Sequence, residues 1–423
     1  MEWQIWFAGI LFLIVYAFII SEKIHRTIIA LFGATLLIVL GVLSQHQAIN
    51  YIDFNTIGLL FGMMVIVGIT RKSGVFEYVA IKSAHSTGGD PVKIMIALSI
   101  VTAVASAFLD NVTTVLLVVP VTISICSILE LSPIPIFVAE ILAANVGGTA
   151  TLIGDPPNIM IGSAAGLGFM DFVKNLTPII IVIFIVTLIL LKLIYKKKLV
   201  TTEENKAKLM KMNPDDAIID HKLMKISLLV IAVVILGFVI HQYLGLEPAT
   251  IAITGAALLM LITRADPEEA LMSVEWATLF FFVGLFILVG GLEKVGIIES
   301  MARAAVGLTH GNITLSTMFI LWFSAIASAF IDNIPFVATF IPLIKEMGQI
   351  GHMNIMPLWW ALSLGACLSG NGTIIGASAN VIVSGIAARE GHPMTFLHYM
   401  KIAFPLMLIS ILISMAYLLI FFV

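Results

Sequence analysis

Two polar, glycine-rich interruptions of otherwise apolar sequence occur in this chain, and both recur later at a fixed spacing. The first pair is SAFLDN (106–111) and NVGGTATLIGDPPN (145–158), and the second is SAFIDN (328–333) and GNGTIIGASAN (370–380). The matched residues, each 222 positions apart, are Asp110 and Asp332, Asn111 and Asn333, Gly148 and Gly370, Thr151 and Thr373, Gly154 and Gly376, and Asn158 and Asn380. The chain is therefore a doubled unit, and we expect its chemistry where the two halves meet.

The composition between these interruptions is that of a bilayer protein. Of the 423 residues, 60% are hydrophobic and only 11% are charged, which would leave a soluble protein without a polar surface. Helices satisfy their own backbone hydrogen bonds in lipid, so we predict an all-α, multi-pass protein of the cytoplasmic membrane. The histidines and the two cysteines form no metal-binding motif. We therefore expect the lipid bilayer as a partner, and no enzyme activity, metal, cofactor or nucleic acid.

The first repeat is predicted to cover residues 1–195. Scaffold helices are expected within residues 3–70, where apolar runs approach the roughly 17–25 residues that cross a bilayer. Residues 93–129 have a carboxylate between two short apolar arms, which favours a re-entrant hairpin over two spans. Residues 133–165 contain the sequence GDPPN, and two prolines make a continuous helix very unfavourable, so we predict a discontinuous helix. A last span at residues 176–195 closes the first half.

A hydrophilic linker at residues 196–225 separates the two repeats. It contains eight of the 22 Lys and Arg residues, and the positive-inside rule places it in the cytoplasm. The second repeat, residues 226–423, has its hairpin at 314–346 and its broken helix at 357–388. We count five crossings in each half, with the broken helix as one and the hairpin as none. This odd number predicts that the second half is inverted relative to the first, whereas parallel halves need an even number. The same threading places the segment SEKIHR (21–26) on the cytoplasmic side.

Carboxylates and polar groups of the interruptions are the candidates for binding a coupling ion. Asp110, Asp155 and Asp332 lie in apolar sequence, where a carboxylate is costly and is most often kept for ion or proton handling. Asp110 and Asp332 can also cap the helices that follow them. Thr114 and Asn145 complete the set. The first half is the better candidate, because the second has Ala, Phe and Cys where the first has Asp155, Thr114 and Asn145.

Neutral groups of the same interruptions are predicted to bind the solute. A broken helix exposes free N–H groups on one side and free carbonyl groups on the other, which can bind a solute without a buried full charge. The alternative is a kink whose polar groups are satisfied only by protein or water. The six candidates are Asn111, Thr151, Asn158, Asn333, Thr373 and Asn380.

Glu140 and the two cysteines lie outside these two sets of candidates. Glu140 is either a second proton site or the partner of a neighbouring polar group. Cys126 and Cys367 are too few for chelation of trivalent arsenic by about three thiolates, so we interpret them as structural.

The sequence around the first pair of interruptions resembles a known family. SAFLDNVTTVLLVVPVT followed by NVGGTATLIGDPPNIMIG is similar to the ArsB/NhaD branch of the ion transporter superfamily. That branch includes arsenical pump membrane proteins, Na⁺/H⁺ antiporters and a P-protein-like subgroup. The residues around both motifs are most similar to those of the P-protein-like subgroup. The resemblance covers essentially the whole chain. It implies inverted repeats, each with scaffold helices and a mobile unit of one hairpin and one broken helix, working by an elevator-type movement.

The resemblance implies a secondary transporter. We expect a proton-coupled antiporter that extrudes arsenite or antimonite; the alternatives are a Na⁺/H⁺ antiporter, a transporter of another small inorganic or organic anion, and a channel or scaffold protein with purely structural breaks. No G-x-x-x-x-G-K-[ST] motif occurs, so the energy comes from an H⁺ or Na⁺ gradient or from a separate ATPase subunit. Both a homodimer and such a subunit are compatible with the sequence.

Overall fold

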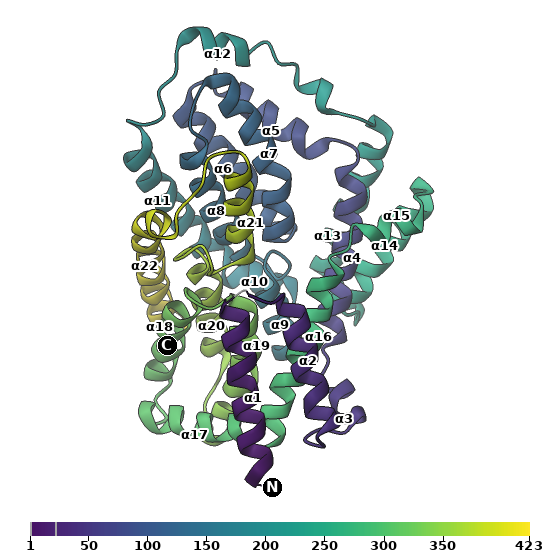
Figure 1. Ribbon diagram of the computed structural model, residues 1–423, viewed down its shortest axis with the longest axis vertical. Coiled ribbons are helices and arrows are strands. Elements are labelled where there is room, and N and C mark those ends of the chain that lie inside the picture. Colours follow the sequence, from purple (N-terminus) through teal and green to yellow (C-terminus); the bar gives the residue numbers. More distant parts are fainter. Residues whose placement is uncertain (1, 22) are drawn as a thin grey trace.

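The computed structural model describes residues 2–21 and 23–423, which form an all-helical protein (Figure 1). The first half contains α1 (Glu2–Ser21), α2 (Arg26–Val39), α3 (Gln45–Asn50), α4 (Phe54–Arg71), α5 (Val75–Ser86), α6 (Pro91–Phe108), α7 (Asn111–Leu129), α8 (Ile134–Thr149), α9 (Pro156–Ala165), α10 (Phe169–Asn175) and α11 (Thr177–Tyr195). The linker contains α12 (Glu203–Leu209) and the 3₁₀ helix η1 (Pro214–Ala217). The second half contains α13 (His221–Leu244), α14 (Pro248–Thr263), α15 (Pro267–Met272), α16 (Trp276–Lys294), α17 (Ile297–Thr309), α18 (Ile313–Ser328), α19 (Asn333–Gly351), α20 (Met356–Ser369), α21 (Ser378–Arg389) and α22 (Phe396–Phe421).

The internal duplication is visible in the helix ends and in the packing. Gly74 and Gly296, which are 222 positions apart, both have left-handed φ angles, of 78° and 81°, immediately before α5 and α17. Glycine adopts this conformation without a steric cost. Helix α4 packs against α14 of the other half, and α2 packs against α16 in the same way. Each contact thus occurs twice, with the two halves exchanging roles.

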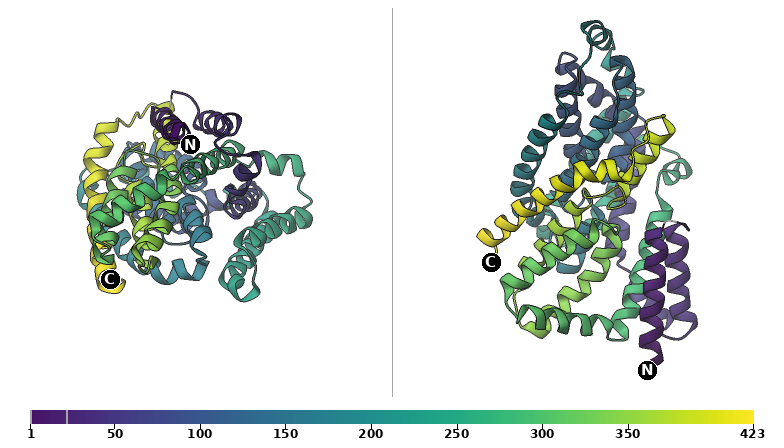
Figure 2. Two further views of the ribbon diagram at one scale, coloured as in Figure 1. Left: turned by 90° about the horizontal axis from the view of Figure 1, so that it is seen from below. Right: turned by 60° about the vertical axis from the view of Figure 1, so that its left-hand side comes forward.

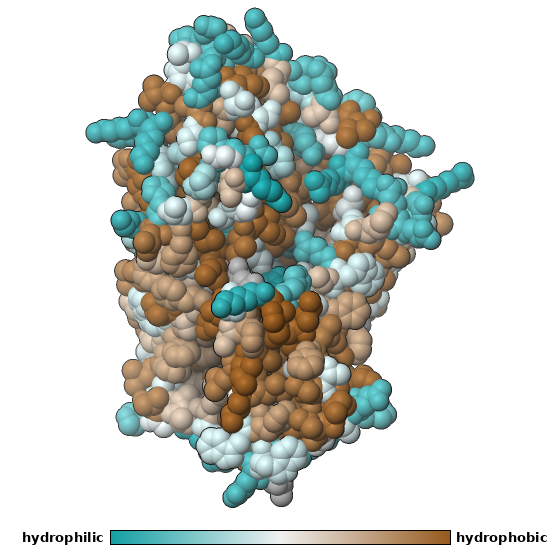
Figure 3. Space-filling view, viewed as in Figure 1, coloured by the Kyte–Doolittle hydropathy of each residue, from teal (hydrophilic) through white to brown (hydrophobic). Residues whose placement is uncertain are grey.

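Within the described residues, eight helices are long and apolar enough to cross a membrane. Figure 3 shows apolar side chains over the middle and lower part of one face, and hydrophilic side chains gathered at its upper end. In the two views of Figure 2, α1 and α2 lie side by side at one edge of the bundle. Together these features describe a multi-pass membrane protein.

The predicted hairpins consist of two helices joined by a very short connection. Helices α6 and α7 contain 18 and 19 residues, and only Leu109 and Asp110 separate them. Both are among the eight helices with the length of a span, so length does not distinguish a re-entrant hairpin from two crossings. In the second half, α18 and α19 contain 16 and 19 residues and meet at Ala329–Asp332.

Both predicted broken helices leave helical geometry where the glycine-rich sequence lies. Helix α8 ends at Thr149 and α9 begins at Pro156, and α20 and α21 are interrupted in the same way. The glycines permit a close approach of backbones: a Cβ on Gly154 would lie 2.5 Å from the Ser106 carbonyl oxygen and 2.6 Å from that of Gly148. A larger residue would therefore push the break away from the hairpin.

The linker lies across one end of the molecule, at the top of Figure 1. The Ile219 N–H donates to the Ser73 carbonyl at 2.9 Å, and one ring nitrogen of His85 lies 3.0 Å from the Leu209 carbonyl. The segment after α4 therefore lies with the linker. Arg26, at the start of α2, reaches the tip of the second hairpin.

Candidate ion and solute site

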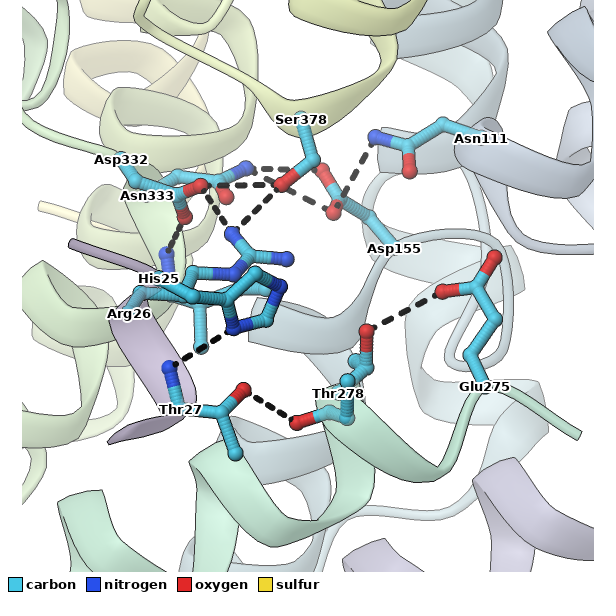
Figure 4. A network of polar contacts seen from close by, with 12 residues as sticks. His25, Arg26, Thr27, Asn111, Asp155, Glu275, Thr278, Asp332, Asn333 and Ser378 are labelled. Atoms are coloured by element: carbon cyan, nitrogen blue, oxygen red, sulfur yellow. Dashed lines mark hydrogen bonds and ion pairs between the residues drawn. The ribbon is translucent and has the colours of Figure 1, made fainter. Parts of the chain in front are cut away.

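The tips of both hairpins meet the break of the first broken helix (Figure 4). Asn111 at the start of α7 donates through its side-chain amide to Asp155 Oδ1, at 3.5 Å. Asn333 at the start of α19 donates to Asp155 Oδ2, at 3.2 Å. The matched residues Asn111 and Asn333 thus approach one carboxylate from opposite sides, and the two halves meet there.

Asp155 is a buried carboxylate without a basic partner. Its side chain is 1% exposed, and no Lys, Arg or His nitrogen of the described residues lies within 4.0 Å of it. It precedes α9 but makes no capping hydrogen bond. Two amide donors do not offset the charge of a desolvated carboxylate. The position therefore suits a group that takes up a proton or a small cation.

Asn145 connects the broken helices of the two halves. Its side-chain oxygen accepts a hydrogen bond from Asn111 at 3.2 Å. Its amide nitrogen donates to the side-chain oxygens of Asn371 and Asn380, both at 3.0 Å. All four amides are buried, so Asn145 carries a continuous polar network from the first hairpin tip to the second break.

The other predicted coupling residues act at least in part as helix caps. Asp110 accepts the Thr113 N–H at 2.7 Å, and Asp332 accepts the Ile334 N–H at 3.0 Å. The Thr114 hydroxyl donates to the Asp110 backbone carbonyl at 2.9 Å. The contacts of Asp110 and Asp332 have the geometry of the capping alternative, whereas that of Thr114 is a bond back to the carbonyl four residues earlier.

The predicted solute-binding threonines attach each break to a hairpin. The Thr151 hydroxyl donates to the Ala107 carbonyl, and the Thr373 hydroxyl donates to the Ala329 carbonyl. Both acceptors lie at the ends of hairpin arms, where helical carbonyls lack an intrahelical donor. These hydroxyls therefore join the hairpin and the broken helix of their own repeat.

Two of the predicted solute-binding asparagines hold the breaks themselves. The amide of Asn158 donates to two carbonyls of its own break, at 3.1 and 2.9 Å, and that of Asn380 does the same at 2.6 and 2.8 Å. The Asn158 side-chain oxygen accepts the hydroxyl of Ser363, at 2.6 Å. Of the six candidates, only Asn111 and Asn333 direct their amides at Asp155.

Arg26 is a residue of this site that the sequence analysis did not select. Its Nη1 donates to Asp332 Oδ2 and to the Ser378 hydroxyl, both at 2.8 Å. Its guanidinium carbon also lies 4.9 Å from the centre of the Phe281 ring, a cation–π distance. The available signal was a single arginine at the start of an apolar run.

A small cavity lies between these groups. Its volume is about 20 Å³, enough for one water molecule but not for an organic solute. The polar residues that line it are Arg26, Asp110, Asn111, Asp155, Glu275, Thr278, Asn333 and Ser378. Glu275 accepts the Thr278 hydroxyl at 3.1 Å and was also absent from the predicted site. The centre is thus acidic and closed to a larger ligand.

Solved transporter structures share this fold at low sequence identity. The YdaH transporter of Alcanivorax borkumensis aligns with a TM-score of 0.56 and 14% identity, covering 99% of this chain and 97% of that one. MtrF of Neisseria gonorrhoeae aligns with a TM-score of 0.60 and 12% identity, covering 92% and 84%.

Sequence relatives are considerably closer. An uncharacterized transporter of Mycobacterium tuberculosis is 43% identical over 415 residues, which cover 96% of both chains. The 46 kDa membrane protein of Mycobacterium leprae is 40% identical over the same length and coverage. The P protein of Homo sapiens is 34% identical over 503 residues, covering 99% of this chain and 60% of that protein.

The likeness to P proteins, expected from the two motifs, is thereby confirmed, but the narrower assignment to the arsenical pumps and Na⁺/H⁺ antiporters of the ArsB/NhaD branch is not confirmed by these relatives. The family model described as citrate transporter matches residues 16–365, which include both hairpins and the first broken helix. The chain therefore belongs to the citrate transporter family of membrane transporters.

Proposed function

We propose that this protein is a proton-coupled secondary transporter of a small anion in the cytoplasmic membrane, and that Asp155 carries the coupling proton. The observation that supports this proposal is the position of Asp155 between the amides of Asn111 and Asn333, buried and without a basic partner. A carboxyl group in that position alternates between a neutral acid and a carboxylate when the site alternates between closed and open.

An anionic substrate is favoured over a neutral one. Among the described residues, Arg26 is the only basic one that lines the central cavity, and the family description names citrate. Arsenite carried as neutral arsenous acid would depend on amides and hydroxyls for its binding. Four of the six such groups already bond to the protein's own backbone. A Na⁺/H⁺ antiporter is the second candidate, because Asp110, Asp155 and Glu275 form an acidic lining.

We also propose that the repeats are inverted and that transport is elevator-type. In support, α9 packs against α19 and α7 against α21, so each hairpin contacts the broken helix of the other half. Helices α5 and α17, which are equivalent in sequence, lie at opposite ends of Figure 1. The hairpins and broken helices would move together against a scaffold formed by α1 to α4 and α13 to α16.

Reconstituted proteoliposomes with a trapped pH indicator test the coupling. An imposed pH gradient should dissipate on addition of citrate, and not on addition of arsenite or Na⁺. Asp155→Asn keeps the shape of the side chain but removes its titration, so substrate-dependent dissipation should fall to the protein-free level. Glu299→Gln, which changes an exposed carboxylate of α17, is the matched control and should behave as the wild type. Full substrate-dependent proton movement in Asp155→Asn would refute the assignment.

A further inference from the structure

Arg26 lies between the central cavity and a larger pocket, which we call the side pocket. The side pocket has a volume of about 280 Å³ and is lined by Arg26, Ser378 and Asp332. Arg26 and Ser378 also line the central cavity of about 20 Å³. The hydrogen-bonded group of Arg26, Asp332 and Ser378 therefore lies between the two spaces.

The guanidinium of Arg26 has donors to spare. Arginine offers five N–H groups, and the two hydrogen bonds that Arg26 makes both come from Nη1. In the part of the chain that the structure describes, Nε and Nη2 have no hydrogen-bond partner. A second carboxylate or other oxyanion could therefore approach the planar fork, which matches such groups bidentately.

Asp332 has alternative partners if Arg26 releases it. Its Oδ1 accepts the Ile334 N–H at 3.0 Å, and its Oδ2 accepts the Ser378 hydroxyl at 2.9 Å. Both donors belong to the second hairpin and the second broken helix, whereas Arg26 begins α2. Breaking the ion pair thus leaves Asp332 hydrogen-bonded inside its own unit and frees the guanidinium.

The side pocket favours an anion with a carbon skeleton. Apart from His25 and the three residues above, its lining is apolar. The apolar residues are Ile19, Ile20, Ile24, Ile375, Val381 and Ile382. The volume lies just below the usual range of small-molecule sites, roughly 300–1,000 Å³, so the ligand is small. A carboxylate on a short hydrocarbon chain suits such walls better than an inorganic oxyanion does.

We propose that Arg26 is the anion-binding residue of this transporter: a small carboxylate entering through the side pocket replaces Asp332 on its guanidinium. This inference rests on the proposed anion transport and adds to it the binding residue, the class of ligand and the route. In the closed state Asp332 occupies the position of the ligand carboxylate. The aspartate is therefore a competitor for Arg26, and removing its charge should strengthen binding.

Calorimetric titration of the purified full-length protein in detergent, with citrate, succinate and phosphate as probes, tests this exchange. Asp332→Asn should bind citrate at least about tenfold more tightly than the wild type, because the competing charge is gone. Arg26→Gln should bind citrate at least about tenfold more weakly than the wild type. The affinity of Arg26→Lys should lie between those of the wild type and Arg26→Gln. Arg303→Gln, which removes an exposed ion pair on α17, should leave the affinity unchanged.

Three results would overturn the inference: unchanged or weaker citrate binding in Asp332→Asn, wild-type affinity in Arg26→Gln, or no binding of any probe to the wild type. Phosphate binding that exceeds carboxylate binding would overturn the choice of ligand. If either single variant fails to fold, the double variant Arg26→Gln with Asp332→Asn leaves no unpaired charge. It should fold and should bind no probe; retained binding would place the site elsewhere.

The outcome is separable from that of the coupling experiment. Asp155→Asn reports on proton movement, and the Arg26 and Asp332 variants report on equilibrium binding without a gradient. Anion binding that depends on Arg26, together with coupling that survives Asp155→Asn, would reject the proton assignment alone. Proton coupling that depends on Asp155, together with an affinity that does not change in Arg26→Gln, would reject the anion site alone.

Discussion

The hairpin-tip aspartates occupy equivalent positions but have different partners. Asp332 forms an ion pair with Arg26 at 2.8 Å, whereas the Asp110 carboxylate, within the described part of the chain, bonds only to Thr113 at the start of its own helix. The position equivalent to Arg26 in the second half is Pro248, which cannot supply a charge. The two halves are thus specialised at the level of single residues. Arg26 balances the negative charge of the second hairpin tip, and the excess of acidic groups lies on the side of Asp110 and Asp155.

Glu140 carries the clearest prediction at the residue scale. Its Oε1 accepts the Thr122 hydroxyl, and its Oε2 is buried without a hydrogen-bond partner among the described residues. An ionised carboxylate there would be uncompensated, so we expect the neutral acid. Glu140→Gln should change the free energy of unfolding by less than about 1 kcal/mol, whereas Thr122→Val, which removes the remaining partner, should cost about 1–3 kcal/mol.

Thermal melting of the purified variants in detergent checks both values. The proteoliposome assay then distinguishes the two roles that the sequence left open for Glu140. Retained proton coupling in Glu140→Gln fits a structural acid, and lost coupling in a stable variant would make Glu140 a second proton site.

At the scale of helices, the breaks were predictable and their internal bonds were not. The two prolines of GDPPN exclude a continuous helix from local geometry alone, and α8 and α9 are separated there. The hydroxyl of Thr151 could equally have faced a solute or a carbonyl. Its acceptor, Ala107, lies 44 positions away and becomes a neighbour only after the hairpin has packed. The sequence analysis did not select Arg26 for the same reason, because its partner Asp332 is 306 positions away.

Two glycines test whether the helix crossings of the scaffold are tight. A Cβ on Gly62 of α4 would lie 2.5 Å from the Ala252 carbonyl carbon, and one on Gly284 of α16 would lie 2.7 Å from that of Ala30. Backbone atoms cannot move aside as a side chain can. Alanine at either position should therefore destabilise the protein by about 1–3 kcal/mol, measured as a lower melting temperature in detergent.

The control is Gly307 of α17, around which nothing lies within 4 Å of a new Cβ. Alanine has the higher helix propensity, so Gly307→Ala should be neutral or stabilising by up to about 1 kcal/mol. Equal melting temperatures for Gly62→Ala and Gly307→Ala would show that the crossing is looser than the structure implies.

At the scale of the whole molecule, the arrangement follows from the doubling of one unit. Contacts between halves come in exchanged pairs, and α8 and α20, like α11 and α22, meet their own counterparts. The constant spacing of 222 residues predicted that the copies meet, but sequence spacing carries no information about which side of the membrane each copy faces. Orientation therefore depends on the charge of the linker and on the parity of the crossings.

Two equivalent turns decide the orientation experimentally. Gly88 follows α5 and His310 follows α17; both are exposed and have left-handed φ angles, of 66° and 52°. Gly88 lies three residues after His85, which contacts the linker, whereas α17 lies at the opposite end of Figure 1. Inverted repeats place these turns on opposite sides of the membrane. An impermeant maleimide should label Gly88→Cys only in everted vesicles and His310→Cys only in intact cells.

The chain suits this experiment because its own cysteines, Cys126 and Cys367, are both buried and should contribute little background. Glu204→Cys marks the linker, since the Glu204 side chain is 78% exposed, whereas the neighbouring Asn205 is buried against the end of α7 and would label poorly. With a cytoplasmic linker, Glu204→Cys and Gly88→Cys should label together from the inside. Labelling of Gly88→Cys and His310→Cys from one side would require parallel repeats. The scaffold and mobile unit proposed above would then lose their symmetry, because an elevator built on inverted repeats needs equivalent turns to face opposite compartments.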